Sequence, residues 1–123
     1  MSDDNPIRSA IEQAIADNEV ILFMKGTPDA PRCGFSAKTV GILDQLGTPF
    51  AAVDILPDPR IRQELSSISN WPTIPQLFHK GELVGGCDIV TEMFETGELA
   101  TELGVEQPAT EGDGPLTIEN RLA

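Results

Sequence analysis

The apolar run Val20–Met24 restricts the fold of this 123-residue chain more than any other segment. Its five consecutive apolar residues include β-branched and aromatic side chains, which predicts a strand buried on both of its faces. The run is far too short to span a bilayer, which takes about 20 apolar residues in a helix. A strand of this kind needs cover from two sides, so we expect helices on both faces of the sheet that contains it.

Hydrophobic periodicity, helix caps and turn residues predict the other elements. In chain order we expect a helix over 6–17, the strand over 20–24, a loop over 26–32, a helix over 33–46 with apolar positions at Phe35, Val40, Leu43 and Leu46, a strand over 50–55, a helix that opens at Asp58-Pro59, strands over 76–79 and 82–84, and a helical region over 87–103 that is interrupted near Gly97. Residues 26–32 are expected to be irregular because Pro28 and Pro31 disfavour regular structure. A βαβ half followed by a hairpin produces a four-stranded mixed sheet with helices on both faces. This α/β arrangement resembles the thioredoxin-like fold.

Length and composition predict a single domain over residues 1–104. With 40% hydrophobic residues the chain can build one ordinary core without disulfide staples. Residues 105–123 contain the breakers Gly112-Asp113-Gly114-Pro115 and several acidic residues. We therefore predict an acidic, flexible tail after the domain.

Charge narrows the range of partners. Acidic residues outnumber basic ones 20 to 8, and the net charge of −12 argues against nucleic acid and anionic membranes. Five of the cations fall in two neighbouring stretches of chain, at Lys25, Arg32, Lys38, Arg60 and Arg62. They suggest a small anionic ligand, although a scatter of solvated charges explains them equally well.

The N-terminus and the cysteine content indicate a reducing compartment. Met1-Ser2-Asp3-Asp4 is acidic and lacks the basic and apolar regions of a signal or transit peptide, so we expect a cytoplasmic location. The two cysteines, Cys33 and Cys87, do not make a disulfide framework. In the cytoplasm such cysteines are typical of catalysis or metal binding.

The tetrad Cys33-Gly34-Phe35-Ser36 lies where a loop ends and a helix is predicted to begin. A thiol at a helix N-terminus is close to unpaired backbone N–H groups and to the positive end of the helix dipole, which favour the nucleophilic and metal-binding thiolate. A dithiol motif would place a second cysteine three positions later, where this chain has Ser36. Cys33 is therefore predicted to be a reactive thiol without a local disulfide partner.

Four blocks of sequence, in order and at regular spacing, resemble those of a known family. They are Lys25-Gly26-Thr27-Pro28, Pro31-Arg32-Cys33-Gly34-Phe35-Ser36, Ser69-Asn70-Trp71-Pro72-Thr73-Ile74-Pro75 and Gly85-Gly86-Cys87-Asp88, to which Arg62 is added. From Ile7 to about Leu103 the chain resembles a single-domain monothiol glutaredoxin of the CGFS type. Ile74 stands where many members carry Phe, at a position that is used mainly through its backbone.

The resemblance implies a glutathione site. The implied binding residues are Lys25, Arg62, Thr73, Ile74, Pro75, Cys87 and Asp88. Lys25 and Arg62 would meet the glycyl carboxylate, and Ile74 would pair through its backbone before a cis Pro75. Cys87 and Asp88 would receive the γ-glutamyl end.

The resemblance also implies a carrier of [2Fe–2S] clusters that serves cluster assembly and iron homeostasis. Such a cluster takes four thiolates, so Cys33 from each chain of a homodimer would join two glutathione thiols as ligands. A rival set, Cys33 and Cys87 from each chain, stays open and predicts independence from glutathione. Apo iron–sulfur proteins would be the recipients.

Two further functions remain open. A glutathione-dependent oxidoreductase would use Cys33 to reduce protein–glutathione mixed disulfides, and the CGFS resemblance implies poor turnover in that role. A regulatory adaptor would report iron status through a mixed cluster with a BolA-like partner.

Three other residues can be interpreted as structural or as functional. Cys87 is interpreted first as a packing or ligand-lining thiol and second as a redox partner of Cys33. Trp71 is interpreted as a packing residue rather than a ligand platform. His79, the single histidine, is interpreted as a strand residue because it has no companion at metal-ligand spacing.

Overall fold

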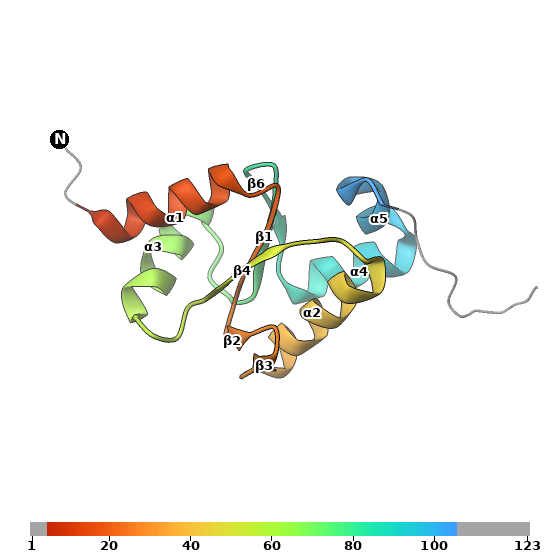
Figure 1. Cartoon of the computed structure of the whole chain (residues 1–123), viewed down its shortest axis with the longest axis horizontal. Coiled ribbons are helices and arrows are strands. Elements are labelled where there is room, and N and C mark those ends of the chain that lie inside the picture. The colour runs from red at the N-terminus through yellow and green to blue at the C-terminus, as the bar shows by residue number, and fades with distance from the viewer. Residues whose placement is uncertain (1–4, 106–123) are drawn as a thin grey trace, which may run out of the picture.

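The computed structural model describes residues 5–105 of the chain (Figure 1). In chain order its elements are α1 (Pro6–Asp17), β1 (Val20–Met24), β2 (Gly26–Thr27), β3 (Ala30–Pro31), α2 (Gly34–Leu46), β4 (Ala51–Asp54), α3 (Pro59–Ser69), β5 (Gln76–His79), β6 (Glu82–Gly85), α4 (Cys87–Thr96) and α5 (Glu98–Leu103). The predicted helices and main strands are all present. No helix in the described part of the chain is long and apolar enough to cross a membrane.

Strand β1 lies inside a four-stranded sheet of order β4-β1-β5-β6. It pairs in parallel with β4 and antiparallel with β5, and β5 pairs antiparallel with β6. Met24 is opposite Asp54, and Phe23 is opposite Gln76. The carboxyl ends of β1 and β4 and the start of β5 therefore meet at one edge of the sheet.

The side chains of β1 divide the core into two layers, because successive residues of a strand point to opposite faces. Val20, Leu22 and Met24 pack with α2, α4 and α5. Ile21 and Phe23 pack with α1 and α3 on the other face. Figure 1 shows the same division, with α1 and α3 on one side of the sheet and the other helices opposite. The prediction of helices on both faces is confirmed.

Local capping interactions explain where the helices begin and end. The Asn5 side chain accepts a hydrogen bond from the Arg8 N–H at 3.0 Å, and the Asp58 side chain accepts one from the Arg60 N–H at 2.9 Å. These contacts satisfy backbone donors that have no partner within the first turn. Helix α2 ends at Gly47, which adopts the left-handed conformation at φ 70°.

The prediction of an irregular loop over 26–32 is wrong, because β2 and β3 form a small antiparallel hairpin there. Pro31 is tolerated because both strands of a two-stranded hairpin are edge strands, so the backbone N–H that proline lacks is not needed to pair with a further strand. The hairpin closes through the Thr27 side chain, which accepts a hydrogen bond from the Ala30 N–H at 3.2 Å. A side chain at Gly26 is excluded, since a Cβ there would lie 2.5 Å from the Ala30 carbonyl oxygen.

Phe35 was predicted on the apolar face of α2, and this assignment is wrong. Its side chain is 62% exposed, while Ser36 and Thr39 take buried positions on the same helix. Thr39 can be buried because its hydroxyl donates to the Phe35 carbonyl oxygen at 2.9 Å. An exposed aromatic ring two residues from Cys33 therefore has to be explained by the site and not by the core.

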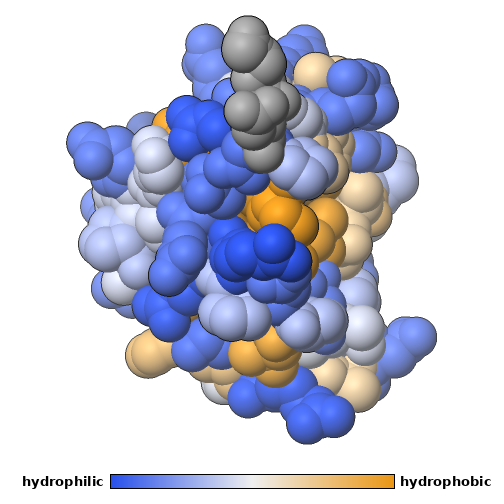
Figure 2. All heavy atoms as spheres, turned by 90° about the vertical axis from the view of Figure 1, so that its left-hand side faces the viewer, coloured by the Kyte–Doolittle hydropathy of each residue, from blue (hydrophilic) through white to orange (hydrophobic). Residues whose placement is uncertain are grey.

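The face built by α1 and α3 carries a hydrophobic hollow among hydrophilic side chains (Figure 2). A groove of about 270 Å³ opens there, lined by Ile7, Ala10, Ile11, Ala14, Phe23, Val53 and Ile61. It lies on the face of the sheet opposite to α2 and α4.

The predicted tail over 105–123 lies outside the described residues except for Val105. That residue packs against the core, and its N–H donates to the Ala100 carbonyl oxygen at 2.9 Å. The predicted boundary at residue 104 stays a prediction.

Phe23 and Phe35 form a matched pair for testing the two-layer core. Phe23 is fully buried and packs edge-to-face on Phe78 with 5.7 Å between ring centroids. We expect Phe23→Ala to lower the free energy of unfolding by about 3–5 kcal/mol. Phe35→Ala should change it by no more than about 0.5 kcal/mol, because the ring is exposed. Urea unfolding followed by circular dichroism measures both, and equal losses would contradict the assignment of Phe35 to the surface.

Candidate functional site

Cys33 lies at the sheet edge where β1 and β4 end and β5 begins. It follows the β2–β3 hairpin and is the N-cap residue of α2, with its side chain half-buried. The hairpin is joined to the end of β1 by a hydrogen bond of 2.9 Å from the Arg32 N–H to the Lys25 carbonyl oxygen. The thiol is thus positioned by the end of the central strand and by the start of a helix.

The pKa of the Cys33 thiol is lowered from its ordinary value. The largest cause is a hydrogen bond from the backbone N–H of Ser36, and the N–H of Phe35, the charge of Lys25 and the Ser36 hydroxyl act in the same direction. Partial burial opposes them and is outweighed. The predicted effect of a helix N-terminus on Cys33 is therefore present, and specific donors produce it.

Ser36 has a structural role at the position where a dithiol motif has its second cysteine. Its side chain is fully buried, and its hydroxyl oxygen accepts a hydrogen bond from the Lys25 N–H at 3.1 Å. The hydroxyl proton remains available to the Cys33 sulfur. Ser36 therefore joins α2 to the end of β1 and also favours the thiolate.

A pocket of about 150 Å³ opens between Phe35 in the first turn of α2, the segment before β5 and the start of α4; Cys33, Lys25 and Arg62 are not among its lining residues. It is lined by Phe35, Trp71, Thr73, Ile74, Gly86, Cys87, Asp88 and Ile89. The peptide bond between Ile74 and Pro75 is cis, as the resemblance implied. Phe35 and Ile89, which are both exposed large apolar residues, form the apolar rim.

Gly86 brings two walls of this pocket close together. It precedes α4 and is buried. A Cβ on Gly86 would lie 3.0 Å from the Trp71 Nε1 atom, 3.3 Å from the Pro75 carbonyl oxygen and 3.7 Å from the Thr73 Oγ1 atom. Three polar atoms therefore surround a position that only glycine leaves open, next to the free N–H groups at the start of α4.

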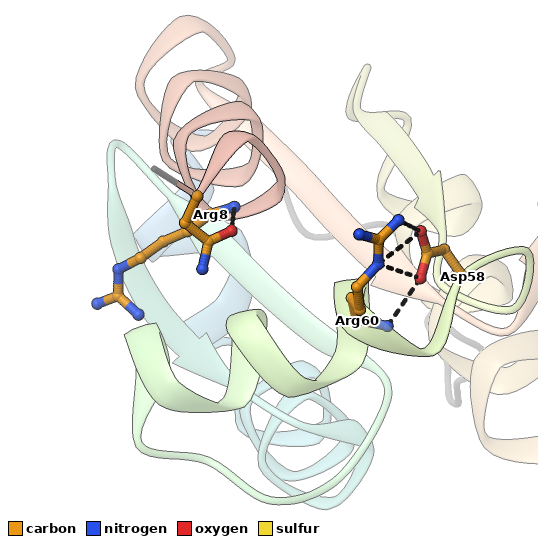
Figure 3. A network of polar contacts seen from close by, with 4 residues as sticks. Arg8, Asp58 and Arg60 are labelled. Carbon is orange, nitrogen blue, oxygen red and sulfur yellow. Dashed lines mark hydrogen bonds and ion pairs between the residues drawn. The ribbon is translucent and has the colours of Figure 1, made fainter. Parts of the chain in front are cut away.

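The two cations that are predicted to bind an anion form no ion pair with an acidic side chain among residues 5–105. Within residues 5–105, neither Lys25 nor Arg62 forms an ion pair, and Arg62 donates only to the Pro72 carbonyl oxygen at 3.3 Å. Arg60, from the same stretch, is different, because its guanidinium pairs with Asp58 at 2.7 Å (Figure 3). That pairing holds the pKa of the Asp58 carboxyl below its ordinary value. Lys25 and Arg62 thus remain able to meet an anion from outside.

Most of the predicted site residues come together. Thr73, Ile74, Cys87 and Asp88 line the pocket, and Pro75 contributes its carbonyl oxygen next to Gly86. Lys25 lies near enough to Cys33 to lower its pKa, whereas Arg62 flanks the pocket from α3 through its bond to Pro72.

Trp71 and the two rim residues were missed as parts of the site. The interpretation of Trp71 as a packing residue is incomplete, because its half-buried ring lines the pocket. Its Nε1 atom is buried and has no hydrogen-bond acceptor among the described residues. The only sequence signal was proximity to predicted ligand residues: Trp71 is two residues before Thr73, and Ile89 directly follows Asp88.

The surroundings of Cys87 and His79 agree with the interpretation of both as structural residues. Cys87 is a buried free thiol whose Sγ atom is 3.9 Å from the Thr91 hydroxyl oxygen. His79 is buried in β5, with Nδ1 at 2.8 Å from a Glu102 carboxylate oxygen. Within the described residues, no group of three or more His, Cys, Asp or Glu side chains could hold a metal ion.

Comparisons with known proteins point to one family. The family model described as Glutaredoxin matches residues 20–84. The chain is 57% identical over 89 residues to Glutaredoxin 4 of Escherichia coli K12, which covers 72% of this chain and 77% of that protein. It is 55% identical over 89 residues to Probable monothiol glutaredoxin 2 of Rickettsia felis, covering 72% and 86%. Monothiol glutaredoxin-S11 of rice is 55% identical over 97 residues, which are 79% of this chain but only 20% of the rice protein.

Solved structures show the same fold. Reduced poplar apo GrxS14 superimposes with a TM-score of 0.72 at 44% identity, covering 80% of this chain and 90% of that one. A buckwheat glutaredoxin–glutathione complex superimposes with a TM-score of 0.71 at 25% identity, covering 80% and 87%. The thioredoxin-like arrangement predicted from the element order is confirmed.

The lowered pKa of Cys33 can be tested by alkylation. The thiolate is the reacting form, so the alkylation rate should rise through a midpoint below the ordinary cysteine pKa of about 8.5 and level off above it. Lys25→Gln removes a positive charge that favours the thiolate, so the midpoint should move to higher pH. Lys38→Gln, at an exposed position of α2, is the matched control. Peptide-resolved mass spectrometry separates Cys33 from Cys87, and a wild-type midpoint at the ordinary value would contradict the assigned donors.

Proposed function

Because the chain belongs to the glutaredoxin family, and within it to the monothiol glutaredoxins, we propose that it binds glutathione and carries a [2Fe–2S] cluster between two copies of itself. The cluster is cargo that is passed to apo iron–sulfur proteins. One observation carries the proposal: a thiolate-favouring Cys33 begins a helix turn that holds Ser36 instead of a second cysteine, and Phe35 of the same turn lines the pocket.

Glutathione suits the chemistry of this pocket. It carries two carboxylates and one ammonium group, so it needs cations, an acid and free backbone donors. Lys25 and Arg62 can meet the glycyl carboxylate. The N–H groups at the start of α4, at Cys87 and Asp88, can hold the γ-glutamyl carboxylate, and the Asp88 side chain can meet the ammonium group. The glutathione complex of the buckwheat relative supports this assignment.

The donor set of one chain is too small for a cluster. A [2Fe–2S] cluster takes four thiolates, and this chain has two cysteines. Two Cys33 thiolates and two glutathione thiols supply four ligands across a symmetric dimer. Glutathione held without a covalent bond can leave with little cost, which suits a protein that hands its cargo on.

The rival set, in which Cys87 replaces glutathione, is less well supported. The Cys87 thiol is buried in the first turn of α4, where it lines the pocket and contacts Thr91. Its sulfur would have to leave these surroundings to reach a cluster shared with another chain. We therefore assign Cys87 to the pocket wall.

A second function is favoured by the lowered pKa of Cys33. The thiolate can attack the glutathione sulfur of a protein–glutathione mixed disulfide, which forms a Cys33–glutathione disulfide and releases the protein thiolate. A second glutathione thiolate then attacks this disulfide, which regenerates Cys33 and yields oxidised glutathione. Rapid turnover in a glutathione-coupled assay, faster than cluster transfer, would make this the main activity.

The partner and the location follow from the same proposal. A BolA-like protein is proposed as a regulatory partner that contributes to a mixed cluster. A cytoplasmic location is proposed because the site works as a thiolate and needs a pool of reduced glutathione.

Cluster assembly under anaerobic conditions tests the proposed ligand set. With iron, sulfide and glutathione, the wild-type protein should give the visible absorbance of a [2Fe–2S] cluster and migrate as a dimer. Removing glutathione, or making Cys33→Ser, should abolish both signals, because each removes two of the four thiolates. Cys87→Ser is the control and should keep both. Assembly that survives without glutathione but fails in Cys87→Ser would replace this ligand set with the rival one.

Gly86 offers a direct test of the glutathione pocket. Gly86→Ala places a Cβ 3.0 Å from Trp71 Nε1 and 3.3 Å from the Pro75 carbonyl oxygen, so the pocket walls must separate. We expect glutathione affinity to fall about tenfold in isothermal titration calorimetry. Gly34→Ala is the matched control, since a Cβ on Gly34 meets nothing within 4 Å. Equal glutathione affinities of the two variants would contradict the assignment of the glutathione site to this pocket.

A further inference from the structure

Gln76 is a fully buried polar residue at the start of β5, directly after the cis Pro75. Its side-chain Nε2 atom donates to the Trp71 carbonyl oxygen at 2.9 Å and to the Thr73 carbonyl oxygen at 3.0 Å. Both N–H bonds of one amide group are thus used on the segment that forms one wall of the pocket.

The orientation of this amide follows from its surroundings. Rotating it by half a turn would place Oε1 against two carbonyl oxygens, which cannot donate. In the observed orientation Oε1 is buried without a donor among the described residues. A buried acceptor without a partner lowers stability, so the two donated hydrogen bonds have to offset that loss. An apolar side chain of equal length would avoid the loss but would leave both carbonyl oxygens unpaired.

The bonds made by Gln76 are part of a wider arrangement. The Pro72 carbonyl oxygen, between the two that Gln76 holds, accepts the hydrogen bond from Arg62. Three consecutive carbonyl groups are therefore held by side chains from β5 and α3. The segment itself belongs to no helix or strand, and Pro72 and Thr73 are exposed. Its conformation depends on these side chains more than on a backbone ladder.

We propose that Gln76 is a positioning residue of the ligand pocket, which holds Trp71 and Thr73 against Gly86 without touching the ligand itself. The fixed segment places the Trp71 Nε1 atom and the Thr73 hydroxyl around the position that Gly86 leaves open. Where the ligand is taken to be glutathione, this inference rests on the proposed function. The positioning of Trp71 does not depend on it.

Trp71 provides the readout, because it is the only tryptophan of the chain and there is no tyrosine. Gln76→Met keeps the length of the side chain and removes both donors. In the full-length protein without ligand, acrylamide should quench Trp71 fluorescence more strongly in Gln76→Met than in the wild type. Glutathione affinity in isothermal titration calorimetry should fall about tenfold, as expected when hydrogen bonds that fix a pocket are lost. The alkylation midpoint of Cys33 should stay unchanged, since its donors lie on α2 and at Lys25.

A core variant separates positioning from general destabilisation. Ile15→Val lowers stability from α1, on the other face of the sheet from α2 and α4, and should leave both the quenching and the affinity at wild-type values. Wild-type quenching and affinity in Gln76→Met would overturn the proposal. If the wild-type protein binds no glutathione, the proposed function fails, whereas the quenching of Trp71 still decides the role of Gln76.

Gln76→Glu keeps the proposal testable if Gln76→Met does not fold. An ionised carboxylate turns oxygen atoms toward both carbonyl groups, while the protonated acid can donate to one of them. Relative to wild type at the same pH, quenching of Trp71 should be stronger at both about pH 5 and about pH 8, because even the protonated acid replaces only one of the two donated hydrogen bonds. Equal quenching of Gln76→Glu and wild type at both pH values would overturn the positioning role.

Discussion

Strand β1 is paired along both edges and packed on both faces, so every other element is placed with reference to it. Its alternating side chains require one layer of helices on each face, which α1 and α3 supply on one side and α2, α4 and α5 on the other. Its parallel partner β4 ends at the same edge, and its antiparallel partner β5 starts there. Burial of one strand thereby brings Lys25, Cys33 and Pro75 to a common edge, although they are far apart in sequence.

The electrostatics of the site are local and run against the overall charge. The chain has a net charge of −12, yet Lys25 and Arg62 have no acidic partner among residues 5–105. Arg60 is instead paired with Asp58 at the start of α3. Helix N-termini add partial positive charge at Cys33 and at Cys87. An acidic protein can therefore hold an anionic thiol ligand, because what matters at short range is which cations remain unpaired.

Much of the fold could be predicted because its signals are local. Asn5, Asp58 and Gly47 mark helix ends through caps and left-handed turns, whose chemistry lies within a few residues. The errors came from competition between local rules and tertiary contacts. Phe35 has helical spacing and apolar character, but its position on α2 faces the pocket rim. The prolines of residues 26–32 do not prevent a hairpin in which few backbone donors are needed.

The sequence by itself determined the central strand, the order of the elements and the reactive cysteine without a second cysteine in its turn. Each of these depends on residues that are close together in the sequence. Only the tertiary structure decided which cations stay unpaired, that Trp71 lines the pocket, and that Gln76 holds the segment around it. The reason is physical: whether a charge, a ring or an amide is available depends on the partners that folding brings near it. The partners of the cations and of Trp71 come from other elements; those of Gln76 are only three and five residues away, but the turn at the cis Pro75 decides that its amide reaches them.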